Sequence, residues 1–495
     1  MRQCRTHEND GAALSTTFDG LVIDGKRVPA ADGRTFETVN PATGDVFRTV
    51  AEAGAEDADR AVRAAARAFE DWGHRTPIQR AKVLYRFADL IEEHADELAL
   101  LETRDMGMAI GDARWCAGNA AAVMRYFAGA VDKFFGSTIP VDRDGIVLTF
   151  REPIGVAALI TPWNFPLNIA NWKTAPALAA GNTVVLKPAS LSPLSALRYA
   201  ELGLEAGLPA GVLNVVPGPG RAVGDALVGH PLVGKVGFTG STEVGVEIAR
   251  KAAGTVKRVT LELGGKSACI VFADADLEKA GRMAPFAVFE NCGQDCCARS
   301  RLLVEESAKD ELLERYAAAT RAIVVGNPES PDTQVGPLVS AGQRDTVESY
   351  IAKGVAEGAS VLEGGQRPDD PTLAAGFYLR PTILDGCTNE MTVAQEEIFG
   401  PVVSVITFSN EEEAIRLAND TPYGLSGSLW TRDGARQLRV ARALRTGCIG
   451  VNSNSSVFPQ APFGGYKQSG VGKELGMEGL VHNTELKSVF VSTEV

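Results

Sequence analysis

The sequence lacks the long apolar segment that a membrane span requires. Its 495 residues are 45% apolar and 22% charged, and no apolar run approaches the roughly 18 residues of a spanning helix. The amino-terminal stretch MRQCRTHENDGAALSTTFDG carries charges and small polar side chains, whereas a secretion signal needs an apolar segment of about 7–15 residues. We therefore expect a cytoplasmic protein with no membrane partner.

Positive charge and histidine are also scarce. The chain has 49 Lys and Arg against 62 Asp and Glu, a formal net charge of −13, and only 5 His. This charge repels nucleic acid at long range, so we expect no nucleic-acid partner. The histidines are scattered and never occur at the short repeated spacing of metal ligands, so we expect no metal.

Cysteine is used sparingly, and its distribution is uneven. Five of the 8 cysteines are scattered singly and are expected to be small buried side chains: Cys4, Cys116, Cys269, Cys387 and Cys448. The stretch ENCGQDCCARS holds the other three, Cys292, Cys296 and Cys297. Adjacent cysteines are expected to point in different directions, and a reducing cytoplasm disfavours disulfides, which argues against both a disulfide framework and a metal cage. A predicted helix ends just before this stretch, so the following loop can expose one thiolate.

Periodicity along the chain predicts an α/β protein of two or three domains. Apolar residues at helical spacing predict two long amphipathic helices over 56–106 and a third over 112–135. From about residue 153, strand-like and helix-like runs alternate, which is typical of a doubly wound parallel sheet with ligands at the carboxyl ends of its strands. The Asp144-Gly145 turn predicts a hairpin, and the tail NTELKSVFVSTEV is a further strand. These strands are candidates to pair with each other or with another subunit.

The stretch FTGSTEVG, Phe238 to Gly245, joins a predicted strand to a predicted helix. Because the helix begins at Ser241, its free backbone N–H groups and the positive end of its dipole favour a phosphate above the turn. The same residues also make an ordinary helix N-cap, and both interpretations stay open. The stretch PGPGRAVG, with glycines at positions 218, 220 and 224, is a looser variant of a dinucleotide-binding loop, or simply the start of a helix.

Two polar side chains occur where chemistry is expected. Asn164 lies between two prolines in PWNFP, which limits the directions of its amide and makes it a candidate oxyanion donor. Its alternative is a turn residue with a local backbone hydrogen bond. Glu262 lies in the apolar run LELGG, where burial would raise its pKa toward the range of a general base. Its alternative is a structural ion pair.

Six stretches, in this order and spacing, resemble the NAD(P)-dependent aldehyde dehydrogenase superfamily: PWNFP, FTGSTEVG, LELGGKS, GQDCCA, EEIFGPV and PFGGYKQSG. The resemblance covers essentially everything after about residue 18. It implies that Cys296 is the nucleophile, that Glu262 activates water, and that Asn164 with the Cys296 backbone N–H holds the oxyanion. The implied reaction is oxidation of an aldehyde to its acid with reduction of NAD(P), through a cysteine thiohemiacetal and a thioester.

The resemblance also implies a binding site for NAD, with NADP possible. Lys187 is expected at the adenosine ribose, Trp163 and Ser241 at the pyrophosphate, and Glu397 and Phe399 on the nicotinamide side. The full set of expected cofactor residues is Pro162, Trp163, Lys187, Gly220, Gly240, Ser241, Gly245, Glu397 and Phe399. The residues expected along the substrate tunnel are Trp172, Asp295, Val457 and Phe458.

The fold that the resemblance implies is aldehyde dehydrogenase-like. A Rossmann-like cofactor domain is expected over 18–130, 153–258 and 446–477, and an α/β catalytic domain over 259–445. A small β oligomerisation domain is expected over 131–152 and 478–495, after a polar tail at 1–17. A homodimer or homotetramer is therefore expected, with a small-molecule aldehyde as substrate.

Two positions depart from the family pattern and leave questions open. Asp295 stands where the family often has an apolar or small residue: it either faces the tunnel and favours a cationic or hydroxylated aldehyde, or makes only local hydrogen bonds. Ser190 stands where many NAD-preferring members carry Glu, which leaves NADP open. Three alternative functions compete with this one: a coenzyme A-acylating dehydrogenase, a catalytically silent family member, and a thiol redox sensor. Glu262 argues against the first, because acylating members usually lack that base.

Overall fold

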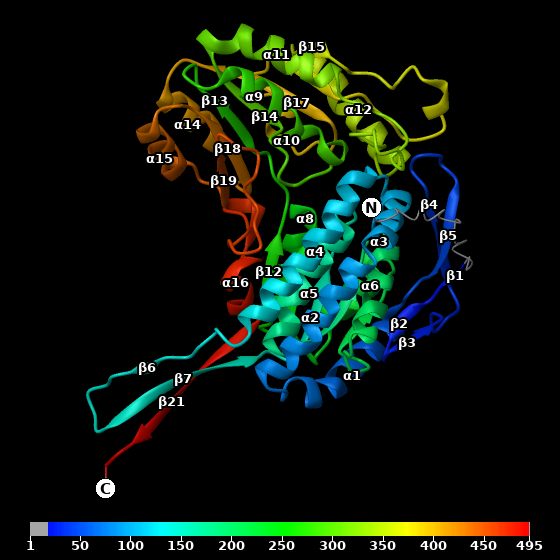
Figure 1. Cartoon of the computed structure of the whole chain (residues 1–495), viewed down its shortest axis with the longest axis vertical. Coiled ribbons are helices and arrows are strands. Elements are labelled where there is room, and N and C mark those ends of the chain that lie inside the picture. Colours follow the sequence, from blue (N-terminus) through cyan, green and yellow to red (C-terminus); the bar gives the residue numbers. More distant parts are fainter. Residues whose placement is uncertain (1–17, 495) are drawn as a thin grey trace, which may run out of the picture.

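The computed structural model describes residues 18–494. Two α/β units lie one above the other, and a narrow ribbon of strands projects from the lower unit with the carboxyl terminus near its tip (Figure 1). Each unit is built around a sheet whose central strands are parallel. The α/β architecture predicted from the sequence is confirmed.

The lower unit contains an eight-stranded sheet of order β20-β12-β11-β8-β9-β10-β2-β3. Its strands, in that order, are Gly470–Val471, Arg258–Glu262, Val233–Thr239, Val156–Ile160, Thr183–Lys187, Leu213–Val215, Leu21–Ile23 and Lys26–Val28. The strands from β12 to β10 run parallel to one another. The outer strands β20, β2 and β3 pair antiparallel, so the doubly wound part of the sheet is its centre.

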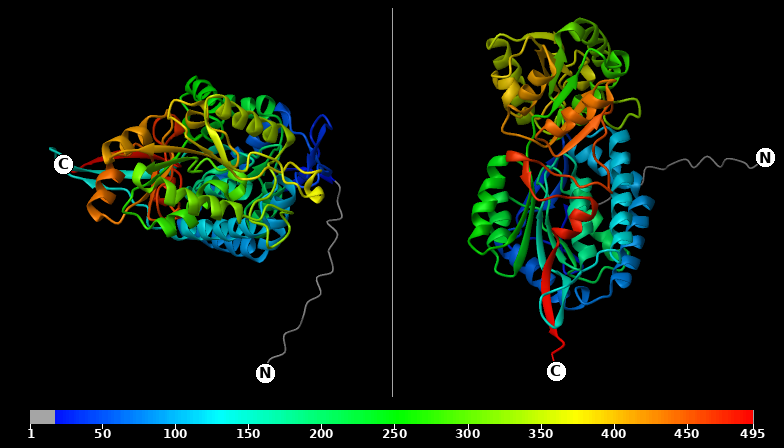
Figure 2. Two further views of the ribbon diagram at one scale, coloured as in Figure 1. Left: turned by 90° about the horizontal axis from the view of Figure 1, so that it is seen from above. Right: turned by 90° about the vertical axis from the view of Figure 1, so that its left-hand side faces the viewer.

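Helices cover both faces of this sheet, as the right-hand view of Figure 2 shows. The reason is visible in β8, where alternate side chains enter two different cores: Val156, Ala158 and Ile160 join one cluster, and Ala157 and Leu159 join the other. The first core includes α1 (Ala55–Trp72), α7 (Asp225–Gly229) and α8 (Thr242–Ala253). The second includes α2 (Pro77–Glu93), α3 (Ala95–Met106), α4 (Ile110–Ala130), α5 (Pro166–Ala180) and α6 (Leu194–Glu205).

The helices predicted over 56–106 are three, not two. The second predicted helix is divided at His94, whose φ of −106° and ψ of 19° interrupt the helical path between α2 and α3. The third predicted helix is α4, and it ends earlier than expected, at Ala130.

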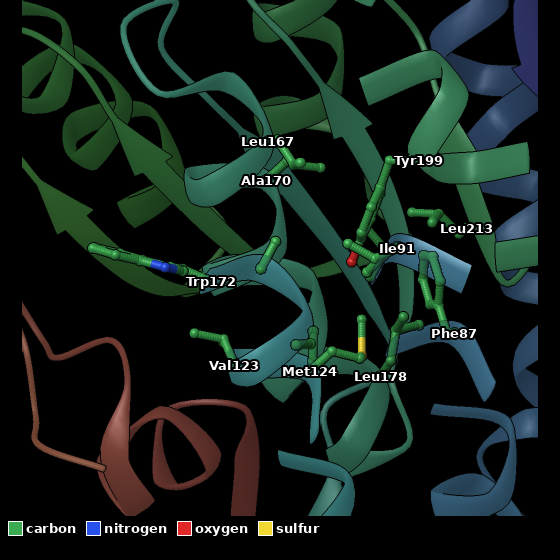
Figure 3. Close-up of a cluster of buried hydrophobic side chains, with 14 of the residues drawn as sticks. Phe87, Ile91, Val123, Met124, Leu167, Ala170, Trp172, Leu178, Tyr199 and Leu213 are labelled. Carbon is green, nitrogen blue, oxygen red and sulfur yellow. The ribbon is translucent and has the colours of Figure 1, made fainter. Parts of the chain in front are cut away.

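Helix α5 is buried along its whole length. Its side chains Leu167, Ala170, Trp172 and Leu178 lie among residues of α2, α4 and α6 in the cluster of Figure 3. Two of its buried polar side chains are bonded to neighbouring segments, Asn171 to the Ala120 carbonyl and Lys173 to the Glu474 carboxylate, as buried polar groups require. Because α5 follows directly after the Asn164 turn, this packing gives that turn a rigid support.

The upper unit contains a seven-stranded sheet of order β15-β16-β17-β14-β13-β18-β19. These strands, in that order, are Ser360–Glu363, Thr382–Asp385, Val402–Phe408, Arg301–Glu305, Ala268–Val271, Ser426–Trp430 and Cys448–Val451. All neighbours pair parallel except β15 with β16. Its helices are α9 (Leu277–Met283), α10 (Phe286–Phe289), α11 (Lys309–Arg321), α12 (Ala341–Ala356), α13 (Thr392–Gln395), α14 (Glu411–Asn419) and α15 (Gly434–Ala443). The predicted segment 446–477 contributes to both units, because β19 belongs to this sheet and β20 to the other.

The projecting ribbon consists of β6 (Thr138–Ile139), β7 (Gly145–Pro153) and β21 (Thr484–Ser492). Strand β7 pairs antiparallel with β6 and, over its full length, with β21. The predicted hairpin and its pairing with the carboxyl-terminal strand are thus confirmed. A short helix, α16 (Gly476–Val481), leads into β21, and a separate small sheet joins β1 (Phe18–Asp19), β5 (Val46–Ala51) and β4 (Thr35–Val39). Among residues 18–494, no helix combines the length and apolar character that crossing a membrane requires.

Candidate active site

Four of the predicted site residues lie at the carboxyl edge of the eight-stranded sheet. Lys187 and Glu262 are the last residues of β9 and β12, while Asn164 and Ser241 follow β8 and β11. The carboxyl ends of parallel strands are where ligands bind in doubly wound folds. The order β12-β11-β8-β9 therefore brings all four side chains to one edge, which faces the upper unit (Figure 1).

The three clustered cysteines lie in a loop with unusual backbone geometry. Asn291 and Cys292 have φ values of 49° and 56°, and Gly293 follows with φ 69°. Left-handed backbone is unfavourable for residues other than glycine, although asparagine tolerates it better than most. Cys292 is buried at the end of this turn. Cys296 is half-buried, which leaves its thiol more open to a ligand.

Hydrogen bonds tie this loop to the turn after β8. The Asn164 amide donates to the Gln294 carbonyl at 2.8 Å. In return, the Asn291 amide donates to the Asn164 carbonyl at 2.8 Å and to the Gln294 carbonyl at 3.4 Å. The Gln294 side chain accepts from the Val339 N–H at 2.9 Å. These bonds join the two units directly at the loop that carries Cys296.

Asn291 and Gln294 were not predicted as site residues. Gln294 stands in the GQDC stretch, and Asn291 is an asparagine two residues before Gly293; asparagine and glycine are the residue types that suit left-handed turns. That signal could have identified the turn. It could not have identified the partners, because Asn164 is 127 positions from Asn291 in the sequence.

Glu262 is 2% exposed, and within residues 18–494 neither of its carboxylate oxygens has a hydrogen-bond partner. Burial raises its pKa well above the ordinary value of 4.5, and the neighbouring Glu474 carboxylate raises it further. The carboxylate lies against the backbone of Gly464, where any larger residue would collide with it. Such a buried, unpaired carboxylate is costly to the fold and fits a general base better than a structural ion pair.

The surroundings of the Cys296 thiol disfavour its ionised form. Contact with the Cys297 thiol, burial, and the carboxylates of Asp295 and Glu397 all raise the pKa of Cys296 well above its ordinary value. The Asp295 carboxylate accepts the Cys297 N–H at 2.9 Å, which favours the second of its two interpretations, a local hydrogen bond. Ionisation of Cys296 therefore needs a base or a nearby positive charge when substrate and cofactor are present.

Several groups at the carboxyl edge fit a bound dinucleotide. The hydroxyls of Thr161 and Thr239, after β8 and at the end of β11, are buried and have no hydrogen-bond partner in the described part of the chain. The Lys187 ammonium donates to the Pro188 carbonyl at 3.1 Å, and burial lowers its pKa to about 8. Orphaned donors of this kind suit the hydroxyls and phosphates of a nucleotide.

The turn after β11 has the predicted form. Ser241 is the N-cap of α8 and accepts the Val244 N–H at 3.4 Å. Gly240 and Gly245 leave no room for side chains, because a Cβ there would collide with Phe238 and Leu263 respectively. Gly220 begins a short π-helical turn over Gly220–Gly224. The N-cap and the open helix start therefore coexist, and the first does not exclude phosphate binding.

The remaining predicted cofactor residues come from both units. The rings of Trp163 and Phe399 lie edge to face with centroids 5.2 Å apart, and Phe399 has a left-handed φ of 56°. The Glu397 carboxylate accepts the Gly265 N–H at 2.8 Å, and burial raises its pKa to about 7. Pro162 is half-buried beside Trp163. The Trp163–Phe399 contact joins the two units at this point.

The predicted tunnel residues have different exposures. Trp172 is buried in α5 and packs edge to face on Phe463 at 5.3 Å. Val457 is half-buried and, like Cys296, packs against the cluster that contains Trp172. Phe458 is 51% exposed and lies at the surface. The structure thus brings Trp172, Val457 and Cys296 to one apolar cluster, with Phe458 outside it.

Comparison with known proteins identifies the chain. The sequence profile described as "Aldehyde dehydrogenase family" matches residues 28–489. The chain belongs to this family. It is therefore an NAD(P)-dependent oxidoreductase that converts an aldehyde to its carboxylic acid.

Three similar proteins match it over nearly their whole length. Betaine aldehyde dehydrogenase of Bacillus subtilis is 46% identical over 96% of this chain and 97% of its own. The crystal structure of PnpE in complex with nicotinamide adenine dinucleotide superposes with a TM-score of 0.95, at 46% identity over 96% of this chain and 98% of that one. Betaine aldehyde dehydrogenase of Staphylococcus aureus in complex with NAD+ gives a TM-score of 0.94, at 42% identity over 96% and 95% of the two chains. The two solved structures share the fold described above.

Proposed function

We propose that Cys296 is the nucleophile of aldehyde oxidation, with Glu262 as the general base and Asn164 as the oxyanion donor. The observation that carries the proposal is their placement. The Asn164 amide is bonded to the loop that carries the half-buried Cys296 thiol, and Glu262 at the end of β12 is a buried carboxylate with no hydrogen-bond partner among residues 18–494. Thiol, base and oxyanion donor are the parts that covalent acyl chemistry requires.

The Cys296 sulfur attacks the aldehyde carbon and forms a thiohemiacetal. The oxygen of that adduct accepts hydrogen bonds from the Asn164 amide and the Cys296 backbone N–H, which hold the developing charge. A nicotinamide cofactor, held by the residues described above, would supply the hydride acceptor for this carbon. Glu262 then removes a proton from water, which attacks the resulting thioester and releases the acid and the Cys296 thiol.

Replacement of the nucleophile tests this assignment. Cys296→Ala is expected to abolish NAD(P)-linked aldehyde oxidation while the protein stays folded, as measured by circular dichroism. Cys269→Ala is the matched control, because it makes the same substitution at a cysteine that is buried within β13. Wild-type turnover by Cys296→Ala would reject the assignment. Rates with and without coenzyme A discriminate the acylating alternative.

The cofactor is proposed to be NAD, with NADP as the second candidate. Support comes from Lys187, whose ammonium stands at the end of β9, and from the relatives crystallised with NAD+. Ser190, half-buried three residues after Lys187, places no carboxylate against a 2′-phosphate. Specificity constants measured with both cofactors decide between them.

The substrate is proposed to be an aldehyde with an apolar body, because Cys296 and Val457 both pack against the apolar cluster that contains Trp172 and Phe463. The Asp295 carboxylate is engaged by the Cys297 N–H, which weakens the argument for a cationic substrate. The named relatives include betaine aldehyde dehydrogenases, so a panel must include both classes. Benzaldehyde, hexanal, an aminoaldehyde and betaine aldehyde, compared by kcat/KM, form that panel.

The protein is proposed to be a cytoplasmic homo-oligomer that associates through the ribbon. Strand β21 is an edge strand of the ribbon, and unpaired edges favour association. Large apolar side chains on β7 and β21 are exposed: Ile146, Phe150, Leu486, Phe490 and Val491. Sedimentation of wild type against Leu486→Asp tests the interface. The seven described cysteines are free thiols, which supports a reducing compartment.

A further inference from the structure

Three potential metal ligands converge in the loop of residues 290–300 that carries Cys296, called the nucleophile loop below. The sulfurs of Cys296 and Cys297 and a carboxylate oxygen of Asp295 all lie within 4.8 Å of one another. This overturns the expectation that the adjacent thiols point apart, and with it the argument against a metal there. The left-handed turn at Asn291, Cys292 and Gly293 and the hydrogen bonds around Gln294 fix the backbone just before these residues.

The donor set fits a thiophilic divalent cation. Zn²⁺ takes tetrahedral sulfur and oxygen ligands at about 2.3 Å and about 2.0–2.2 Å respectively, which places two bound sulfurs ~3.8 Å apart. The observed spacing within 4.8 Å is close enough for small χ1 rotations to complete the contacts. Three protein ligands with a fourth open position is a common zinc arrangement.

One hydrogen bond orients a ligand of this set, and one positive charge lies beside it. The Asp295 carboxylate is oriented by its hydrogen bond from the Cys297 N–H at 2.9 Å, as outer hydrogen bonds orient metal ligands elsewhere. The Arg299 guanidinium donates to the Cys297 carbonyl at 2.9 Å, so the preference for a cation comes from the three ligand atoms themselves. Cys292 is buried and is not among the three converging ligands, so it serves as an internal reference.

We propose that Asp295, Cys296 and Cys297 form a reversible binding site for one thiophilic divalent cation of the Zn²⁺ class, and that its occupation inhibits the enzyme. On binding, the cation loses water ligands and the two thiols release their protons to solvent. No electron transfer is involved. The inhibitory part rests on the proposed function, because the bound cation engages the sulfur that would attack the aldehyde. A chelator restores that sulfur.

Cadmium binding tests the site without catalysis. Chelator-treated full-length protein is titrated with Cd²⁺, and the ultraviolet cadmium–thiolate charge-transfer band is recorded for wild type, Cys297→Ser, Asp295→Asn and Cys292→Ser. One Cd²⁺ per chain is expected for wild type. Affinity should fall about tenfold or more for Cys297→Ser, and less for Asp295→Asn. Cys292→Ser should match wild type. An unchanged band and affinity in Cys297→Ser would overturn the site.

Inhibition is measured separately with Zn²⁺, each variant relative to its own metal-free rate. Wild type should lose aldehyde oxidation with one Zn²⁺ and recover it with chelator, and Cys297→Ser should need about tenfold more Zn²⁺. Equal sensitivity of the two proteins would overturn the inhibitory role. If the metal-free wild type does not oxidise aldehydes at all, the proposed function fails, whereas the cadmium result still decides whether the site exists.

Discussion

The two sheets of the protein deliver their candidate catalytic residues in opposite ways. In the eight-stranded sheet, Asn164, Lys187 and Glu262 lie at the carboxyl ends of parallel strands. In the seven-stranded sheet, Cys296 and Glu397 lie in loops that precede strands, five residues before β14 and β17 respectively. The candidate site therefore lies where the carboxyl edge of one sheet meets the amino edge of the other. The end of a strand is enough to position the residues of the eight-stranded sheet. The loop residues of the seven-stranded sheet also need hydrogen bonds from outside that sheet.

The nucleophile loop obtains its position at a cost in backbone strain. Left-handed conformations at Asn291 and Cys292 each cost about 1–2 kcal/mol. The hydrogen bonds that connect the loop to the turn at Asn164 offset this strain, at about 1 kcal/mol each. On the eight-stranded side the comparable support is the packing of α5. The comparison predicts different sensitivities on the two sides.

The largest effect is expected at Glu262, which is the last residue of β12 in the eight-stranded sheet. Glu262→Gln removes the general base, and steady-state turnover should fall by about 10²- to 10⁴-fold. Thioester formation does not need this base, so rapid mixing should show a burst of reduced cofactor equal to one per active chain. An unchanged steady-state rate without a burst would remove Glu262 from the mechanism.

The same variant should alter how stability depends on pH. Burial raises the pKa of Glu262, so the folded chain holds this proton more tightly than the unfolded chain does. Its contribution to stability is therefore full below the ordinary value of 4.5 and is lost as pH rises toward the folded pKa. Glu262→Gln should flatten this loss, so its Tm relative to wild type should be higher at pH 8 than at pH 5. A Tm difference that does not change with pH would contradict the raised pKa.

The next largest effect is expected at Asn164. Loss of an oxyanion donor lowers turnover by about 10²- to 10³-fold, and Asn164→Ala should lower kcat more than it raises KM. Asn168→Ala is the matched control, because Asn168 is a buried asparagine of α5 that makes no hydrogen bond to the nucleophile loop within residues 18–494. Equal kinetic losses in the two variants would show that α5 packing, and not the amide of Asn164, is responsible.

The strand-side residues could be predicted from sequence because their positions depend on local rules. A strand followed by a turn at Gly240 and a helix at Ser241 places the cap of α8 at the carboxyl edge, whatever the rest of the chain does. The hairpin at Asp144 followed the same logic, since a turn signal and two alternating runs suffice. Its pairing with β21 remained one of two alternatives until the structure showed the full register.

The loop-side geometry could not be predicted, because it depends on contacts distant in sequence. The motif resemblance implies the role of nucleophile for Cys296. Nothing in the local sequence indicates that Asn291 bonds to Asn164, or that Gln294 bonds to Val339. The expectation that Cys296 and Cys297 diverge was wrong for the same reason. It considered two adjacent residues alone, whereas the loop is shaped by a strained turn and by the other sheet.

A smaller effect is expected at Asn291, where strain and hydrogen bonding can be separated. Asn291→Ala removes the amide and leaves an unsuitable left-handed residue, so kcat/KM should fall about tenfold through misplacement of Cys296. Asn291→Gly removes the amide and relieves the backbone. If kcat/KM for glycine is as low as for alanine, the amide positions the loop. If glycine restores it, the backbone conformation is what matters. The alkylation rate of Cys296 by iodoacetamide should change in parallel with kcat/KM.

The smallest effect is expected at Ser190, on the strand side and away from the loop. Ser190→Glu places a carboxylate three residues after Lys187, where it can repel a 2′-phosphate and accept a bond from a ribose hydroxyl. The ratio of kcat/KM for NADP to that for NAD should fall about tenfold, while Ser190→Gln, of equal size and no charge, leaves it near wild type. The alkylation rate of Cys296 should not change in either variant, because the strand end at Lys187 holds its position without the loop. A change in that rate would mean that the strand end at Lys187 and the loop that carries Cys296 are coupled. Strand-positioned and loop-positioned residues would then not be independent of each other.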